Sequence, residues 1–197
     1  MSHAVPTDGG LEMDMGRYGL IGRKLGHSFS PAIHAMIGDY EYKLYPLEPE
    51  ELEGFVRSGG LDGFNVTIPY KQAVMPHCDE LTEQARSIGS VNTMVRTENG
   101  WLGDNTDYAG FVRLLGDSAE RLAGKKAIVL GSGGASRTVC AVLKDKGIEA
   151  VVISRQGEDN YDTLDRHADA RLIVNSTPVG MYPDNGRAAV DLSLFPD

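Results

Sequence analysis

The sequence lacks several features that would place it in a broad class at once. Its two cysteines, Cys78 and Cys140, have no CxxC spacing, so it predicts neither a disulfide framework nor a zinc site. No run of about 18 apolar residues is present, so we expect no membrane span. Residues 1–15 have neither the basic nor the apolar region of a signal peptide, and we expect them to form a disordered lead-in. These absences favour a cytoplasmic protein with reduced thiols.

An excess of basic residues is also missing. The chain carries 28 acidic and 19 basic residues, a formal net charge of -9. Such a chain repels a phosphate backbone, so we expect no nucleic-acid partner. Hydrophobic residues make up 41% and charged residues 24%, as in ordinary globular proteins. Small anions remain accessible as ligands if local donors meet them.

Short strand and helix signals alternate over the first 115 residues. Apolar or β-branched runs predict strands at 18–21, 42–47, 64–68, 91–95 and 101–103, with a hairpin turn at Asn99-Gly100. Amphipathic spacing predicts helices at 31–37, 49–57, 81–88 and 107–115, the first opened by Pro31. We expect these elements to form an α/β substrate-binding domain over residues 16–120.

The pattern changes after a boundary that we place near residues 117–124. Ala127–Leu130 is a continuous apolar run, typical of a strand buried on both faces of a parallel sheet. A glycine-rich break, a helix over 135–146 and further buried strands at 150–153 and 171–174 follow. This β-α-β-α-β order predicts an incomplete Rossmann-type, doubly wound nucleotide-binding domain over residues 121–197. The fold class is therefore α/β.

The glycine-rich break has the spacing of a dinucleotide site. Gly131-x-Gly133-x-x-Ser136 lies between a strand and a helix, where glycines let the backbone approach a pyrophosphate at the helix start. A tight turn without a ligand is the alternative. The next strand ends Ile153-Ser154-Arg155, with no acidic residue before Glu158. An arginine there suits a 2′-phosphate and favours NADP over NAD, unless it is merely an exposed loop residue.

Five segments together resemble the shikimate dehydrogenase family, in the family's order. They are Tyr18–Gly22 with His27–Pro31, Asn65–Lys71, Ile88–Thr93 with Gly103–Asp107, Gly131–Arg137, and Asn175–Pro183. The resemblance covers about Tyr18 to Pro183. It implies that Lys71 and Asp107 form the catalytic pair, and that Ser28, Ser30, Thr67 and Asn92 bind the substrate. It assigns the cofactor to Gly131, Gly133, Gly134, Ala135, Ser154, Arg155 and Thr177, and it implies no metal.

The residues themselves leave several of these roles open. A lysine can exchange a proton with an alcohol if burial lowers its pKa, whereas a neighbouring carboxylate favours its charged form. Ser30 could serve only as an N-cap before Pro31. Asn65 and Asn105 suit turn formation or bracing of a loop as well as a place in the cleft. We expect His34 to be a packing residue.

By resemblance, the activity is the NADP-dependent interconversion of 3-dehydroshikimate and shikimate, a step of chorismate and aromatic amino acid biosynthesis. Quinate dehydrogenase activity is an alternative, because a carboxylate and ring hydroxyls are all that the site requires. A non-catalytic ligand-binding fragment is another. The family continues beyond residue 197, so we expect a truncated chain with reduced stability, weak turnover and exposed sheet edges that could pair two copies into a homodimer.

Overall fold

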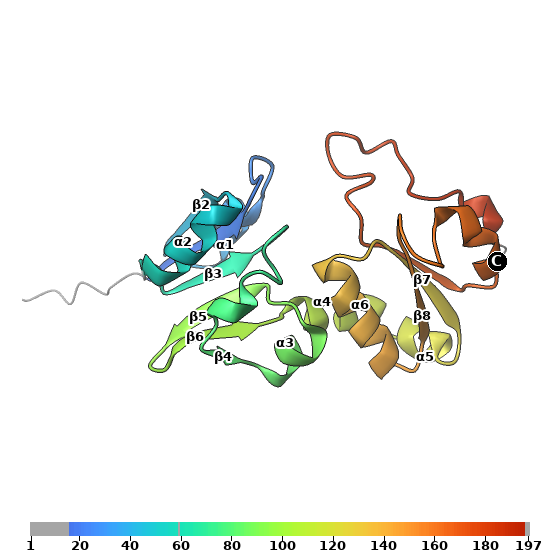
Figure 1. Ribbon diagram of the computed structural model, residues 1–197, viewed down its shortest axis with the longest axis horizontal. Coiled ribbons are helices and arrows are strands. Elements are labelled where there is room, and N and C mark those ends of the chain that lie inside the picture. Colours follow the sequence, from blue (N-terminus) through green and yellow to red (C-terminus); the bar gives the residue numbers. More distant parts are fainter. Residues whose placement is uncertain (1–15, 59, 196–197) are drawn as a thin grey trace, which may run out of the picture.

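The computed structural model describes residues 16–58 and 60–195, so the predicted disordered lead-in of residues 1–15 lies outside the described residues. In this part of the chain two sheets form, and each is the centre of an α/β unit (Figure 1). The first sheet has six strands and the second has three. The mixed α/β class predicted from the alternating signals is confirmed.

The sheet of the first unit is mixed. Its strands are β1 (Arg17–Gly22), β2 (Glu41–Pro46), β3 (Gly63–Val66), β4 (Glu80–Leu81), β5 (Thr93–Thr97) and β6 (Gly100–Asp104). Their order is β2-β1-β3-β5-β6-β4. β1 is parallel to β2 and β3, and β5 is antiparallel to both β3 and β6. The β5–β6 hairpin turns at Asn99-Gly100 as predicted, and Gly100 adopts a φ of 112° that favours glycine.

Helices flank this sheet. They are α1 (Ser30–Ile37), the 3-10 turn η1 (Pro49–Glu51), α2 (Leu52–Ser58), the 3-10 turn η2 (Met75–His77) and α3 (Glu83–Ile88). The core contains Ile21, Val74, Val91 and Met94, none of them exposed. Trp101 closes it, donating from Nε1 to the Val56 carbonyl at 3.1 Å.

The second sheet is parallel and small. It consists of β7 (Lys126–Leu130), β8 (Glu149–Ile153) and β9 (Leu172–Asn175) in the order β8-β7-β9. The chain returns past β7 to place β9 on the side opposite β8, so the direction of winding reverses at β7. Ligands of doubly wound sheets bind at this reversal, beyond the carboxyl ends of the strands.

Helices cover both faces of the second sheet. They are α4 (Asp107–Leu115), α5 (Ser118–Leu122), α6 (Gly134–Asp145) and the 3-10 segments η3 (Tyr161–His167) and η4 (Leu192–Leu194). Leu115 of α4 and Ala119 of α5 lie in one core with Val129 of β7 and Val142 of α6. α4 and α6 lie between the two sheets in Figure 1. The boundary predicted near 117–124 would therefore cut through this core.

The outer strands of the second sheet are less buried than the sequence predicts. β7 is buried as predicted, but β8 and β9 are only partly buried. Each of them pairs on one side only, since both lie at an edge of the sheet. The connection from β8 to β9 is also not α-helical: η3 contains a non-helical residue, Thr163, whose hydroxyl is bonded to the backbone N–H of Asn160 at 3.0 Å. This bond is one half of a capping box at the start of η3.

Candidate active site

A cavity of about 770 Å³ lies where the two units meet. One wall comes from the segment after β3, and the other from the segments that follow β7, β8 and β9. The lining residues are Thr67–Pro69, Lys71, Gln72, Gly131–Ala135, Ser154, Arg155, Tyr161 and Ser176–Val179. All seven predicted cofactor residues are in this set, together with Lys71 and Thr67. The volume lies within the usual range of small-molecule sites.

The glycine loop forms the part of the cavity beyond β7. Gly131 has a φ of 102°, and a Cβ atom there would come within 3.0 Å of the Thr177 side chain. Around Gly133, by contrast, an added Cβ atom would meet nothing within 4 Å. α6 starts at Gly134, and the first N–H groups of a helix have no partner within the helix. The loop thus combines open space with unpaired donors, which is what an anion such as a pyrophosphate requires.

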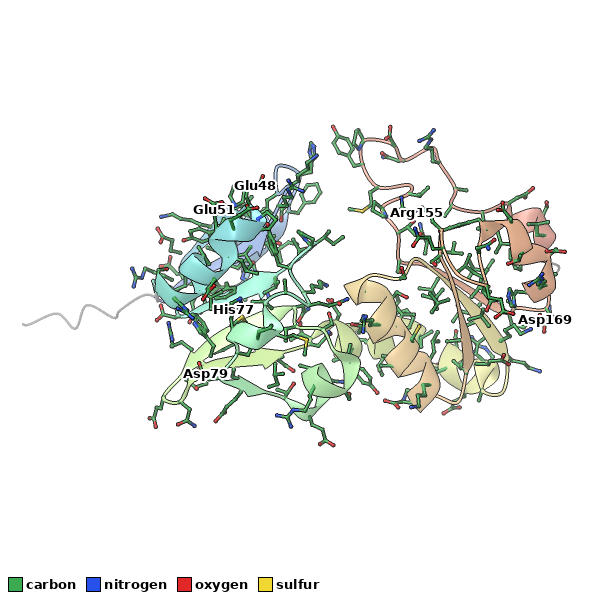
Figure 2. The ribbon with its side chains drawn as sticks, in the orientation of Figure 1. Glu48, Glu51, His77, Asp79, Arg155 and Asp169 are labelled. Carbon is green, nitrogen blue, oxygen red and sulfur yellow. The ribbon has the colours of Figure 1, made fainter. Side chains whose placement is uncertain are left out.

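Two further loops extend this wall. Arg155 follows β8, is exposed, and lies on the side of the second unit that faces the first (Figure 2). The Ser154 hydroxyl donates to the Gln156 carbonyl and holds the turn that carries Arg155. Beyond β9, the Thr177 hydroxyl donates to Asn175 Oδ1 at 2.6 Å, so this threonine offers the cavity its oxygen and methyl group.

Lys71 and Asp107 lie together. The Lys71 Nζ atom is 2.5 Å from Asp107 Oδ2, and the lysine side chain is 16% exposed against 42% for the aspartate. Lys71 is held in place by its own carbonyl, which accepts from the Val91 N–H at 2.7 Å, and by its neighbour Tyr70, whose hydroxyl donates to the Leu47 carbonyl. Asp107 is the first residue of α4, where the helix dipole favours a negative charge.

The lysine also borders the glycine loop directly. A Cβ atom on Gly134 would lie 3.2 Å from Lys71 Cβ and 3.0 Å from Ser90 Oγ. A side chain at this position would require the lysine stem or the serine hydroxyl to shift by a few tenths of an ångström. Consequently, the amine lies on the first unit's side of the cavity while its stem packs against the second unit.

The two serines of the HSxSP segment are bonded to each other. Ser28 Oγ donates to Ser30 Oγ at 3.1 Å and accepts from the Ser30 N–H at 3.2 Å. The reading of Ser30 as an N-cap is wrong: α1 begins at Ser30, and Phe29 occupies the cap position without a side-chain bond. Ser28 accepts the free N–H because it precedes the helix by two residues. Neither serine lines the cavity described above.

The three asparagines differ in their surroundings. Asn65 accepts from Tyr42 and donates to Thr93. Asn92, which is 8% exposed, directs its amide at Thr106. Asn105 does not face the cleft as expected: it is fully buried and donates to the Ser90 carbonyl at 2.8 Å and to Thr138 at 3.1 Å. It braces the first unit against α6, in line with the alternative reading.

The sequence pattern missed several residues at this site. Tyr42 has its hydroxyl against Asn65 and its ring stacked on His34, with the ring centroids 3.6 Å apart. Burial raises the pKa of Tyr42 to about 12 and lowers that of His34, so both are neutral at pH 7. Gln72 and Tyr161 line the cavity. Gln72 could have been suspected as the neighbour of Lys71, but Tyr161 follows an irregular connection and carries no motif.

An aromatic contact joins the two units. His27, beside Ser28, and Tyr182, from the long segment after β9, have ring centroids 5.3 Å apart in an edge-to-face arrangement. In the ribbon that segment extends from the second unit towards the first (Figure 1). This contact joins residues 155 positions apart, one from each unit.

Residues 16–58 and 60–195 contain neither a metal-binding cluster nor a membrane-spanning helix. No group of three or more His, Cys, Asp or Glu side chains is arranged to hold a metal. None of the helices described there is long and apolar enough to cross a bilayer.

Comparison with known proteins now adds to this geometry. The family described as "Shikimate dehydrogenase substrate binding domain" matches residues 20–94. The "Shikimate dehydrogenase (NADP(+))" of Synechocystis is 37% identical over 206 residues, covering 89% of this chain and 71% of the relative.

Solved structures agree with the sequence match. The shikimate 5-dehydrogenase of Thermus thermophilus, in complex with NADP(H) and shikimate, is 32% identical with a TM-score of 0.80 over 92% of this chain and 76% of that one. A quinate dehydrogenase from Corynebacterium glutamicum, in complex with NAD, is 28% identical with a TM-score of 0.76 over 91% and 76%. The fold and the sequence define a two-unit α/β dehydrogenase. The chain belongs to the shikimate dehydrogenase family.

Proposed function

We propose that this chain binds shikimate and NADP and interconverts shikimate and 3-dehydroshikimate. The observation that carries the proposal is the Lys71–Asp107 pair, with its nitrogen and oxygen 2.5 Å apart, beside a cavity whose far wall is a glycine loop. In this position the Lys71 amine can reach an oxygen on the substrate ring, while the nicotinamide lies against the opposite wall of the cavity. The names of the relatives support the choice of substrate and cofactor.

The residues present fit NADP. The cavity has room beside Gly133, unpaired N–H groups at the start of α6 and an exposed arginine after β8. We assign the pyrophosphate to Gly131, Gly133, Gly134 and Ala135, and the 2′-phosphate to Ser154 and Arg155. Thr177 lies at the nicotinamide side. When bound, NADPH supplies the hydride that reduces the ketone.

Lys71 handles the proton. In the direction of reduction, the Lys71 ammonium group gives a proton to the ketone oxygen as the hydride reaches the carbon, and the product is the alcohol. In oxidation, Lys71 Nζ takes the proton from the hydroxyl oxygen. Asp107 accepts a hydrogen bond from the same nitrogen throughout, which holds the amine in one direction and stabilises its charged form.

The serines and the polar strand ends hold the substrate. We assign the carboxylate to the Ser28 and Ser30 hydroxyls, and the ring hydroxyls to Thr67, Asn92 and Asp107. Neutral hydroxyls and amides can bind a polyol without adding charge.

Calorimetry and a turnover assay on the full chain test the proposal. We expect shikimate and NADP⁺ to bind, and NADPH to form when both are present. Quinate and NAD⁺ serve as parallel ligands: tighter binding of quinate would replace the substrate, and equal turnover with NAD⁺ would remove the role of Arg155. Binding of shikimate without any NADPH in single-turnover conditions would favour a ligand-binding module. No binding of either acid would overturn the proposal.

A further inference from the structure

A line of hydrogen bonds crosses the first sheet beneath the proposed substrate site. We propose that Tyr42, which no motif contains, and Thr93, to which the sequence gives no role, are positioning residues that fix which groups of this site donate and which accept. The inference rests on the proposed function, because it concerns how the same site holds shikimate.

The line joins four side chains from neighbouring parts of the sheet. The Tyr42 hydroxyl of β2 donates to Asn65 Oδ1 at 2.8 Å, and Asn65 Nδ2 donates to Thr93 Oγ1 at 3.2 Å. The Thr93 hydroxyl donates in turn to Asn92 Oδ1 at 3.0 Å. β1 lies between β2 and β3, so the tyrosine side chain must span that strand to reach Asn65. Asn65 and Thr93 are direct partners in the β3–β5 ladder.

A backbone group sets the direction of the line at one end. The Thr106 N–H, which can only donate, lies 2.9 Å from Asn92 Oδ1 and thereby fixes the orientation of this amide. Asn92 Nδ2 then donates one of its two N–H groups to Thr106 Oγ1 at 3.0 Å. The second N–H group can donate to a ligand. Thr106 immediately precedes Asp107, so the line ends beside the catalytic carboxylate.

The remaining polarities follow from counting protons. A hydroxyl group has one proton, and Thr93 gives its proton to Asn92. Its oxygen therefore accepts from Asn65 Nδ2, which turns Asn65 Oδ1 towards Tyr42. Tyr42 must donate its single proton to that oxygen. The tyrosine oxygen can then offer only lone pairs to the site.

The serine pair lies at the other end of the site. The Ser30 hydroxyl opposes the rise in the Tyr42 pKa that burial causes. Ser28 has given its proton to Ser30 Oγ, so the one uncommitted proton of the pair is that of Ser30. Because Tyr42 has donated its proton to Asn65, it does not compete with Ser30 as a donor. The network thus leaves Ser30 and Asn92 as donors, suited to the carboxylate and to a ring hydroxyl oxygen.

Three variants of the full chain test the inference by calorimetry with shikimate. Tyr42→Phe and Thr93→Val keep the size of the side chain and remove the hydroxyl. We expect each to weaken shikimate binding about 5- to 10-fold, the usual effect of one lost hydrogen bond. Thr93→Ser should restore binding to within about 2-fold of the unchanged chain, since the hydroxyl returns.

Tyr45→Phe is the matched control, because Tyr45 lies on the same strand and packs beside the first core. It should bind shikimate as the unchanged chain does. A positioning role also predicts that KM rises while kcat changes little, whereas loss of folded protein would lower kcat alone. If Thr93→Val does not fold, Tyr42→Phe and Thr93→Ser still decide.

The outcomes separate the two proposals. If the unchanged chain binds shikimate and Tyr42→Phe and Thr93→Val match Tyr45→Phe, the positioning role is wrong and the proposed function stands. If the unchanged chain does not bind shikimate, the proposed function fails and the positioning role fails with it.

Discussion

The wall of the cavity that the first unit supplies differs from the wall that the second unit supplies. On the first side, Lys71 is tied to Asp107 before any ligand arrives, and the nearby strand-end residues Asn65 and Asn92, which do not line the cavity, are likewise tied to other side chains. On the second side, the surface beyond β7 consists of glycines and a helix start, with open space around Gly133. A site for a ring with several hydroxyls needs side chains held in fixed directions. A site for a pyrophosphate needs backbone donors and room.

The largest effect should come from removing the Lys71 amine, which belongs to the wall that the first unit supplies. Lys71→Met keeps the stem that packs near Gly134 and removes the proton donor. We expect single-turnover reduction to slow by about 10²- to 10⁴-fold, the usual contribution of general acid–base catalysis. Lys43→Met is the control, since Lys43 also forms an ion pair, with Glu41, but is exposed. Equal rates for the two variants would show that Lys71 moves no proton.

We expect a smaller effect from a substitution in the wall that the second unit supplies. Arg155→Gln should weaken NADP⁺ binding about 10- to 100-fold while NAD⁺ binding changes little, because one charge-assisted hydrogen-bonding group is lost. Calorimetry with both cofactors measures the ratio. Arg166→Gln, an exposed arginine on η3, should leave that ratio unchanged. An equal loss of both cofactors would mean that Arg155 holds something other than the 2′-phosphate.

Two glycines of the same loop separate folding from binding. Gly131→Ala should lower the free energy of unfolding by about 1–3 kcal/mol, because φ is 102° and the new Cβ atom would meet Thr177. Gly133→Ala should change it by less than about 1 kcal/mol, since φ is -83° and the space is open. It should nonetheless weaken NADP⁺ binding by filling that space. Thermal unfolding with and without NADP⁺ distinguishes these results, and equal destabilisation by both changes would contradict the comparison.

The cysteines provide the smallest and most local test, because each unit has one of them. Burial raises the pKa of Cys78 to about 11 and also raises that of Cys140, so both are protonated at pH 8 and should alkylate slowly. We expect Cys140, on α6 of the unit with the smaller sheet, to react severalfold faster than Cys78. Mass spectrometry of peptides after timed alkylation measures both rates, and a faster Cys78 would reverse the expected order of local opening.

Local sequence patterns predicted most of the elements and the glycine-rich turn. Glycine spacing, the run Ala127–Leu130 and the end of the next strand depend on a few neighbouring residues, and the seven residues that the resemblance assigns to the cofactor line the cavity. The position of β9 could not be predicted, because strand order depends on pairing between distant segments. For the same reason α4 was assigned to the first domain, although its apolar face packs on the second sheet.

The directions of individual side chains also could not be predicted from the sequence. Asn105 looked like a cleft residue because it lies at the end of a strand, but its amide joins two units whose contact leaves no trace in the local sequence. Tyr42 was passed over for the opposite reason. In a strand it resembles any aromatic core residue, and only the pairing of β1 with both β2 and β3 brings its hydroxyl to Asn65.

Trp101 is the sole tryptophan of the chain, and it is nearly buried in the first unit with the Arg96 guanidinium 4.0 Å from its ring centroid. Indole emission is therefore an intrinsic optical reporter for that half of the molecule, blind to the other half. Circular dichroism sums both halves. A melt followed by the two signals in parallel would reveal, without any label, whether the halves come apart together or in sequence.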